Sequence, residues 1–381
     1  MNFESGSKSG SVAPSSFDAC PERVIEIARI KLEAPTFEHV LGEVQKSGFY
    51  PRQMVENIYA SLILGNVILA GPPGTGKTAL AKAVADAFRV QLSTETANPE
   101  WSVYDIIGSQ FLNDKGGIES RSGIVTKAIL DCAKAVVANL DTGGAPQATW
   151  LLIDELNRAE IDRAFGPLFT ALSSSDVGTF RLDHLPGNKQ IAIPARFRII
   201  ATVNDYDTRF VNSMSGALRR RFARVPVGPP PNDSDGGIPS GELNRILEKA
   251  RISASGLVSQ AEFDESWKHL IEFNDDIRII FGAFRNLGDH GGVPIGSALI
   301  IDTLAYASMH SVVVKAYAEA DRTGSFWNVL DRSLSTRLIA ALETDATRLR
   351  LKDGYLSAFR EKLPQCPASL SRLTSFIHAV D

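Results

Sequence analysis

The stretch that decides the fold runs from Asn66 to Phe88 and reads NVILAGPPGTGKTALAKAVADAF. It begins with a short apolar run, which is typical of a buried strand. It ends with apolar side chains spaced to share one face of a helix. Between the two, glycine and proline residues interrupt both patterns and mark a turn. The stretch therefore predicts a strand, a tight glycine-rich turn and a helix in direct succession.

The turn has the composition that a phosphate group requires. Residues 71–78 read GPPGTGKT, the pattern of fixed glycines followed by Lys77 and Thr78 that is known as a P-loop. Glycines let the backbone wrap around a phosphate with its N–H groups turned inward, and the positive end of the helix dipole strengthens that field. Lys77 is expected to reach the β and γ phosphates, and the Thr78 hydroxyl to hold Mg²⁺.

The alternative is a glycine-proline turn with an accidental lysine, a match expected in about one chain in a hundred of this length. We therefore expect ATP or GTP with Mg²⁺ to be bound here. The expected binding residues are Gly71, Pro72, Pro73, Gly74, Thr75, Gly76, Lys77, Thr78 and Ala79.

Short apolar runs separated by helical stretches continue to Val225. They read VQLST at residues 90–94, WLLI at 150–153 and FRIIATV at 197–203. Such runs are typical of a parallel sheet covered by helices on both faces, so the predicted fold class is α/β. Apolar side chains at helical spacing between Pro21 and Leu64 predict leading helices that pack on this sheet.

Two of these runs end in polar side chains, at the sheet edge where α/β proteins bind ligands. Asp154 is expected to support Mg²⁺ and Glu155 to orient or deprotonate the attacking water. The alternative is that both acids open a helix, where the helix dipole favours them. Asn204 offers a donor and an acceptor on one group, so it is expected to contact the γ-phosphate and the water, although it could equally cap a turn.

Four arginines crowd the segment LRRRFAR, at residues 218–224. A guanidinium supplied by a neighbouring subunit would neutralise charge that develops on the γ-phosphate. The alternatives are a solvated basic turn that pairs with acids of its own subunit and a contact with nucleic-acid phosphates. We expect at least one of these arginines to serve nucleotide chemistry.

Composition limits the class of protein. The 381 residues carry a net charge of -4, which gives no general basic field for capturing nucleic acid. Cys20, Cys132 and Cys366 lie far apart without metal-ligand spacing, which indicates free thiols in a reducing compartment. No apolar run approaches the roughly 18 to 20 residues that a membrane span needs, and the first residues do not resemble a signal peptide. A cytoplasmic protein without a membrane is expected.

Composition also predicts the division of the chain. Residues 1–20 are rich in Ser and Gly and are expected to form a flexible tail. Residues 21–228 are expected to form the α/β core with its leading helices. The run VGPPPNDSDGG, from Val227, makes continuous secondary structure unfavourable, so it marks the boundary. Residues 229–381 repeat apolar side chains at helical period and predict a small all-helical lid domain.

In this order the motifs resemble those of AAA+ ATPases, from about residue 55 to the end of the chain. Residues 71–78 match the family's Walker A motif, LLIDE at 151–155 its Walker B motif, Asn204 its sensor 1 and LRRRF its arginine-finger box. Residues 98–108, 154–159 and 217–222 are most similar to McrB-like motor subunits of modification-dependent restriction systems, with MoxR-type ATPases close behind. The resemblance implies that Arg221, directly before Phe222, is the finger, with Arg220 next.

Two more features follow from the resemblance. Residues 165–194 resemble the hairpin that these clades insert before the sensor 1 strand, and GTFRLDHL and KQIAIPA also read as two short strands around a Pro-Gly turn. With an insertion around residues 101–126, the hairpin would present loops toward a pore or a partner. The lid arginine known as sensor 2 is not evident: Gly296 and Ser297 stand near the expected helix start, and Arg337 is only a weak substitute.

The resemblance implies a motor that hydrolyses ATP or GTP with Mg²⁺, assembles head to tail into a homo-oligomeric ring such as a hexamer, and drives a separate effector. A McrC-like nuclease in anti-phage defence is the preferred effector, with DNA engaged through the assembly. A MoxR-like role in remodelling a partner protein is the alternative. A second alternative is a scaffold that responds to nucleotide binding alone. A third is DNA translocation by this chain alone, and the excess of acidic residues argues against it.

Overall fold

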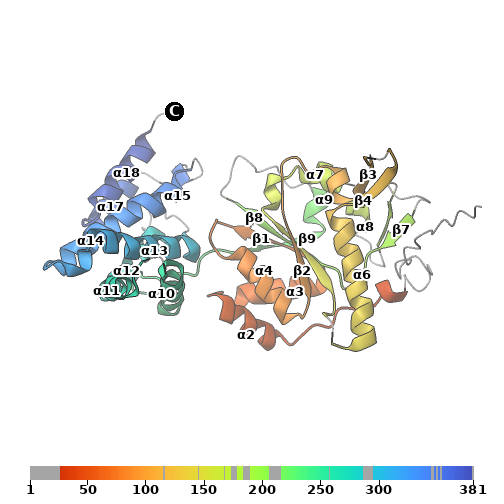
Figure 1. The fold of residues 1–381 in the computed structure, drawn as a ribbon, viewed down its shortest axis with the longest axis horizontal. Coiled ribbons are helices and arrows are strands. Elements are labelled where there is room, and N and C mark those ends of the chain that lie inside the picture. Colours follow the sequence, from red (N-terminus) through yellow and green to blue (C-terminus); the bar gives the residue numbers. More distant parts are fainter. Residues whose placement is uncertain are drawn as a thin grey trace, which may run out of the picture.

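The structure is a computed structural model of the chain. It describes residues 26–114, 116–144, 146–166, 168–172, 178–182, 189–205, 216–256, 258–285, 295–344, 347–348, 351 and 354–379. The expected tail at residues 1–20 lies outside this description. Figure 1 shows an α/β lobe that carries the sheet and a separate lobe of C-terminal helices. The predicted fold class is therefore confirmed: an α/β P-loop core is followed by a helical lid.

The α/β lobe is built on a five-stranded parallel sheet with the order β2-β5-β8-β1-β9. Its strands are β1 (Asn66–Gly71), β2 (Gln91–Thr96), β5 (Thr149–Asp154), β8 (Ile199–Asn204) and β9 (Phe222–Pro226). The first four contain the predicted apolar runs. The edge strand β9 was not predicted, because its sequence FARVP carries an arginine and buries only two of its five residues.

Helices flank this sheet. They include α2 (Phe37–Ser47), α3 (Arg52–Leu64), α4 (Lys77–Ala87) and α6 (Ile124–Thr142). Helix α3 packs on β1 and β9, α6 packs on β5, and α4 contacts β1, β2, β5 and β8. Of the leading helices expected to pack on the sheet, α3 does so, whereas α2 packs on α3 and α4. Val24 and Ile25, which were expected in the first leading helix, lie outside the described residues. Leu64 was expected on the buried face of α3, but as the last residue of that helix it is 88 % exposed.

Two antiparallel hairpins stand beside the main sheet. The pair β6 (Thr179–Leu182) and β7 (Lys189–Ala192) is the hairpin predicted within residues 165–194. The pair β3 (Gly108–Leu112) and β4 (Ile118–Ser122) lies in the insertion at residues 101–126 and was not predicted as strands. Short helical segments join these parts: α5 (Val103–Ile106), η1 (Leu156–Arg158), α7 (Ile161–Phe165), α8 (Leu168–Ala171) and α9 (Gly216–Arg219).

A buried arginine ties the leading helices to the sheet. The Arg198 guanidinium donates to the carbonyl oxygens of Leu62 at 2.6 Å and Ile63 at 3.0 Å, in the last turn of α3. It also donates to Ala195 O and Phe197 O, just before β8. Burial lowers the pKa of Arg198. Its donors thus satisfy helix-end carbonyls that would otherwise lie buried without partners.

The C-terminal lobe is a bundle of helices with its own hydrophobic core. Its elements are α10 (Ser240–Ala254), α11 (Gln260–Ile271), α12 (Asn274–Arg285), α13 (Ser297–Val314), η4 (Ala316–Ala318), α14 (Arg322–Ser333), the π-helical turn η5 (Leu334–Ile339), α15 (Ala340–Leu342), α17 (Tyr355–Lys362) and α18 (Pro367–His378). This core runs from Ile238 to Phe376, whereas the core of the α/β lobe ends at Val227.

Helix α13 is the central helix of the lid. Among the described helices it alone is long and apolar enough to cross a membrane, although the sequence was expected to contain no such run. It packs against α10, α11 and α14, with Ile300, Leu304 and Ala307 fully buried. Its apolar character is thus explained by the core that it forms.

Candidate nucleotide-binding site

A cavity of about 250 Å³ opens at the turn between β1 and α4. It brings together the P-loop, the ends of β5 and β8 and one lid residue; its lining is Pro73, Gly74, Gly76, Lys77, Thr78, Ala79, Asp154, Glu155, Thr202, Asn204 and Ala298. Gly74 and Gly76 have φ values of 74° and 80°, a backbone region that glycine enters without strain. Of the expected binding residues, only Gly71, Pro72 and Thr75 do not line the cavity.

Lys77 lies buried against the loop from which it projects. Its ammonium donates to Gly71 O at 3.0 Å and to Pro72 O at 2.6 Å. Burial lowers the pKa of Lys77 to about 8, while the charges of Asp154, Asp205 and Glu155 oppose that shift. Two carbonyl groups therefore hold the lysine at the cavity, and a bound phosphate could accept hydrogen bonds from its ammonium group in their place.

A set of oxygen atoms surrounds Asp154 at the end of β5. The Thr78 hydroxyl donates to both carboxylate oxygens, at 3.0 and 3.2 Å, and the Thr202 hydroxyl donates to the first of them. Among the described residues there is no cluster of three His, Cys, Asp or Glu side chains for a metal ion. One carboxylate and a hydroxyl nonetheless fit Mg²⁺, which binds through few protein ligands and takes the rest from phosphate and water.

Glu155 follows Asp154 in a left-handed backbone conformation, with φ of 55° and ψ of 42°. Its N–H donates to the Thr202 hydroxyl at 2.9 Å, which ties this bend to the adjacent strand β8. Its carboxylate pairs with Arg158 Nε at 2.8 Å. Because of this bend the two consecutive carboxylates have different partners. Asp154 accepts hydrogen bonds from Thr78, and Glu155 pairs with Arg158.

Asn204 ends β8 at the same edge of the sheet. Its position is fixed through its backbone, because its N–H donates to Asn157 Oδ1 at 3.1 Å. In the sheet register it stands beside Gly71, where β1 enters the P-loop. The structure thus brings Lys77, Glu155 and Asn204 to one cavity, as the sequence predicted for their strands.

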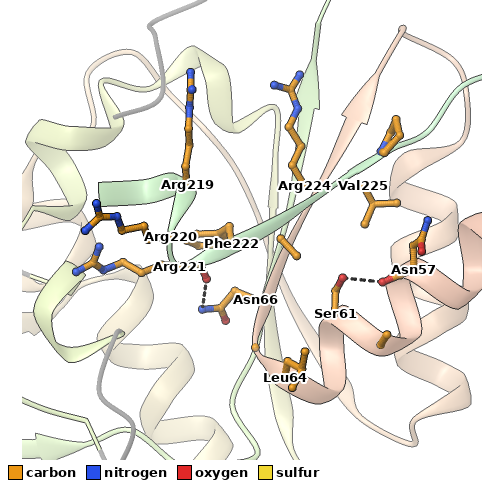
Figure 2. Close-up of a pocket in the computed structure, with 14 residues that line it drawn as sticks. Asn57, Ser61, Leu64, Asn66, Arg219, Arg220, Arg221, Phe222, Arg224 and Val225 are labelled. Carbon is orange, nitrogen blue, oxygen red and sulfur yellow. Dashed lines mark hydrogen bonds between the residues drawn. The ribbon is translucent and has the colours of Figure 1, made fainter. Parts of the chain in front are cut away.

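The arginine cluster lines a different pocket, of about 600 Å³, between the end of α3 and the start of β9. Its lining shares no residue with the P-loop cavity of the same chain. Figure 2 shows Arg220 and Arg221 pointing to the same side, while Arg219 and Arg224 point elsewhere. Arg219 and Arg220 are exposed, and Arg224 forms an ion pair with Asp205 at 2.6 Å.

Arg221 is the member of this cluster with the most defined position. Its Nε donates to Phe169 O, and its guanidinium carbon lies 5.5 Å from the centre of the Phe169 ring. Its own carbonyl accepts from Asn66 Nδ2 at 3.4 Å, a bond drawn in Figure 2. These contacts fix the arginine at the start of β9 while its guanidinium stays half-buried.

Sequence reasoning missed several residues of the site. Thr202 and Asn157 hold Asp154, Glu155 and Asn204 in place, but a threonine inside an apolar strand gives no sign of that role. Tyr50, buried between α2 and α3, donates through its hydroxyl to Gly76 O at 3.0 Å. No local pattern could have assigned Tyr50 to the P-loop, 26 residues away.

Among the described residues, the lid reaches the cavity through Ala298 and not through an arginine. Arg337, the weak candidate for sensor 2, lies in η5 with its guanidinium carbon 5.3 Å from the centre of the Tyr306 ring, and it does not line the cavity. Ser297 donates to Glu242 Oε1 inside the lid at 2.6 Å. Within the described residues, the first turn of α13 carries no charged side chain.

Comparison with known proteins gives one family match. Residues 66–222 match the family model described as "AAA domain (dynein-related subfamily)". A search of curated proteins gave no match.

Solved structures with low similarity include a putative ATPase from Cytophaga hutchinsonii, 14 % identical over 77 % of this chain and 84 % of the other, with a TM-score of 0.38. Two single-residue variants of RuvB from Thermotoga maritima are 17 % and 16 % identical, over 86 % and 82 % of this chain and 77 % and 76 % of theirs, with TM-scores of 0.37 and 0.40. With TM-scores below 0.5, neither protein bears on the function of this chain.

Proposed function

Since residues 66–222 form an AAA domain, the chain is an AAA+ P-loop ATPase, and we propose that it works as a ring-forming motor for a separate effector protein. The observation that carries this proposal is the single cavity that unites Lys77, Asp154, Glu155 and Asn204. The ends of three adjacent parallel strands, β5, β8 and β1, supply these groups together with the P-loop.

ATP and Mg²⁺ fit the residues of this cavity. Gly74, Gly76 and Lys77 would bind the phosphates, while Thr78 and Asp154 would hold Mg²⁺, which when bound neutralises charge on the phosphate oxygens. Glu155 would orient and deprotonate the attacking water, and Asn204 would hydrogen-bond the γ-phosphate and that water. For Glu155 to act in this way it must leave its ion pair with Arg158, which is an exposed pair and therefore weak.

The arginine finger is proposed to act on a neighbouring subunit. The position of Arg220 and Arg221 supports this, because their pocket lies apart from the P-loop cavity of the same chain. Head-to-tail contacts of this kind close into a ring when the rotation between subunits permits. Activity would then depend on assembly.

Two variants test the enzymatic core. Lys77→Ala should abolish ATP binding, and Glu155→Gln should retain ATP and Mg²⁺ while hydrolysis falls by two or more orders of magnitude. The measurements are binding of a fluorescent ATP analogue and steady-state release of phosphate. Wild-type protein that binds neither ATP nor GTP in the presence of Mg²⁺ would refute the proposal.

Glu155→Gln also separates a motor from a scaffold that responds to nucleotide binding alone. A motor variant that binds but does not hydrolyse ATP should lose its biological output, whereas a scaffold should keep it. We propose the motor, because a scaffold has no need of a carboxylate placed beside the P-loop and tied by its backbone to β8.

For the effector we propose a McrC-like nuclease in anti-phage restriction, and for the alternative a partner protein that is remodelled in the manner of MoxR-type ATPases. The residues 98–108, 154–159 and 217–222 support the first by their similarity to McrB-like subunits. Purified chain should bind a McrC-like nuclease, and this nuclease should stimulate its ATPase activity. Stimulation instead by a neighbouring von Willebrand-type protein would favour the alternative.

A further inference from the structure

The lid and the P-loop meet backbone to backbone. Ala298, in the first turn of α13, donates its N–H to Gly74 O at 3.1 Å. Gly296, directly before that helix, lies so close that an added Cβ atom would stand 2.2 Å from Gly74 C and O and 2.6 Å from Thr75 N. Real Cβ atoms do not occur at such distances from backbone, so this contact exists only because position 296 has no side chain.

The backbone conformation of Gly296 does not itself require glycine. Its φ of -80° and ψ of 161° lie in the extended region, which any residue adopts. It stands at the N-cap of α13, where Ser, Thr, Asp or Asn would stabilise a helix better than a residue without a capping side chain. Glycine is tolerated at an N-cap but is not required there, so the feature that requires glycine at this position is the close approach to the P-loop.

The lid edge that makes this approach is rigidly held. Arg285, at the end of α12, pairs with both carboxylate oxygens of Glu242 at 2.8 and 2.6 Å, and both side chains are buried. Ser297 donates to the same carboxylate at 2.6 Å, and Arg285 Nε donates to Ile295 O at 3.1 Å. The starts of α10 and α13 and the end of α12 therefore move as one unit.

We propose that Gly296 is a positioning residue for ATP binding: its side-chain-free contact with Gly74 and Thr75 lets the lid hold the P-loop in its phosphate-binding conformation. The inference rests on the proposed ATPase function. A loop ordered before ATP arrives loses less freedom on binding, so the contact should raise affinity. By reciprocity, bound ATP should favour the closed lid to the same extent. The lid would thus act through backbone atoms, with no charged side chain in the first turn of α13.

The test is Gly296→Ala, with Gly296→Asn as a second variant. Both should force α13 off the P-loop and weaken binding of ATP with Mg²⁺ about tenfold, while the melting temperature without nucleotide stays within about 2 °C of wild type. Asn is the sharper case, because it should cap α13 better than glycine while binding ATP worse. The Ala298 amide should exchange with deuterium faster in both variants, while amides of the distant helix α14 remain as protected as before.

Gly228→Ala is the matched control. A Cβ atom there would meet nothing within 4 Å, so ATP affinity and amide exchange should both match wild type. Wild-type affinity in Gly296→Ala, unchanged protection of Ala298, or an affinity loss that merely follows a large fall in melting temperature in both variants would overturn the inference. Wild-type protein without ATPase activity would instead refute the proposed function, so the two failures are distinguishable.

Discussion

Lys77 makes nucleotide binding depend on pH. In the free protein, burial lowers its pKa to about 8, and bound phosphates would favour its charged form. We expect ATP binding near pH 8 to take up a proton from solution, and the affinity to fall as the pH rises above that value. Titration calorimetry in buffers of different ionisation enthalpy measures the uptake.

The matched control for Lys77 is Lys77→Arg, because a guanidinium keeps its charge throughout this range. Whatever affinity remains, binding by this variant should show no proton uptake, and uptake equal to wild type would contradict the assignment.

The lowered pKa of Lys77 also affects folding stability. Since the unfolded pKa, near 10.5, exceeds the folded one, the unfolded chain holds more protons between about pH 8 and 10.5, so this group adds stability as the pH rises through that window.

Arg198 is expected to matter for stability without touching the cavity. Replacing it by Met keeps an unbranched side chain but removes the donors that satisfy four carbonyl oxygens, two of them at Leu62 and Ile63. We expect the free energy of unfolding to fall by about 2–4 kcal/mol. Chemical denaturation measures it. Arg163→Met removes an exposed pair with Glu160 and should stay within about 0.5 kcal/mol of wild type.

Among the helices and their connections, the turn between α2 and α3 supports the P-loop through Tyr50. Tyr50→Phe removes only the hydroxyl that donates to Gly76 O, so we expect the KM for ATP to rise roughly two- to fivefold, which corresponds to about 0.5–1 kcal/mol. Steady-state kinetics measures the KM.

Tyr59→Phe provides the control for Tyr50. It also removes a hydroxyl bonded to a carbonyl, that of Pro35 at 2.8 Å, in the same part of the fold but away from the P-loop. It should lower stability to a similar degree and leave the KM unchanged. Equal effects of both variants on KM would show that Tyr50 acts on stability alone.

The sequence predicted best those strands and turns whose own residues also form the candidate site. The P-loop and the strands before Asp154 and Asn204 could be predicted, because a short apolar run that ends in polar residues is typical of a buried strand leading into a site. Strand β9 could not, because an edge strand need not be apolar and the arginine cluster at its start indicated a different role. The contacts of Tyr50, Thr202 and Ala298 could not be predicted either, since each joins the site through the fold and not through sequence spacing.

For the assembled protein, the proposed finger predicts complementation between inactive subunits. Lys77→Ala should lack nucleotide, and the double variant Arg220→Ala with Arg221→Ala should lack the finger, so each alone should be inactive. Mixed in equal amounts, about one interface in four would join an intact P-loop to an intact finger, so we expect up to roughly a quarter of wild-type ATPase activity. Phosphate release by the mixture measures it.

A control mixture keeps that experiment specific. Lys77→Ala with Glu155→Gln combines two subunits that both lack machinery on the same side of the interface, so no activity should return. Mixed rings that form, as judged by size-exclusion chromatography, but remain inactive in the first mixture would contradict a finger in trans.

We also propose that the chain divides near residue 228, as its composition predicted. The two separate hydrophobic cores support this division.

The pairing of β1 with β9 has one more consequence. The two strands run parallel with Asn66 opposite Phe222, so the arginines precede the pair at one end and the P-loop follows β1 at the other. Six residues of strand span about 20 Å, too far for one triphosphate to touch both ends. Hydrogen-bonded strands bend little over that length. In the proposed ring, the rigid pair of strands would therefore couple the nucleotide of one subunit to the finger that the same subunit supplies to its neighbour.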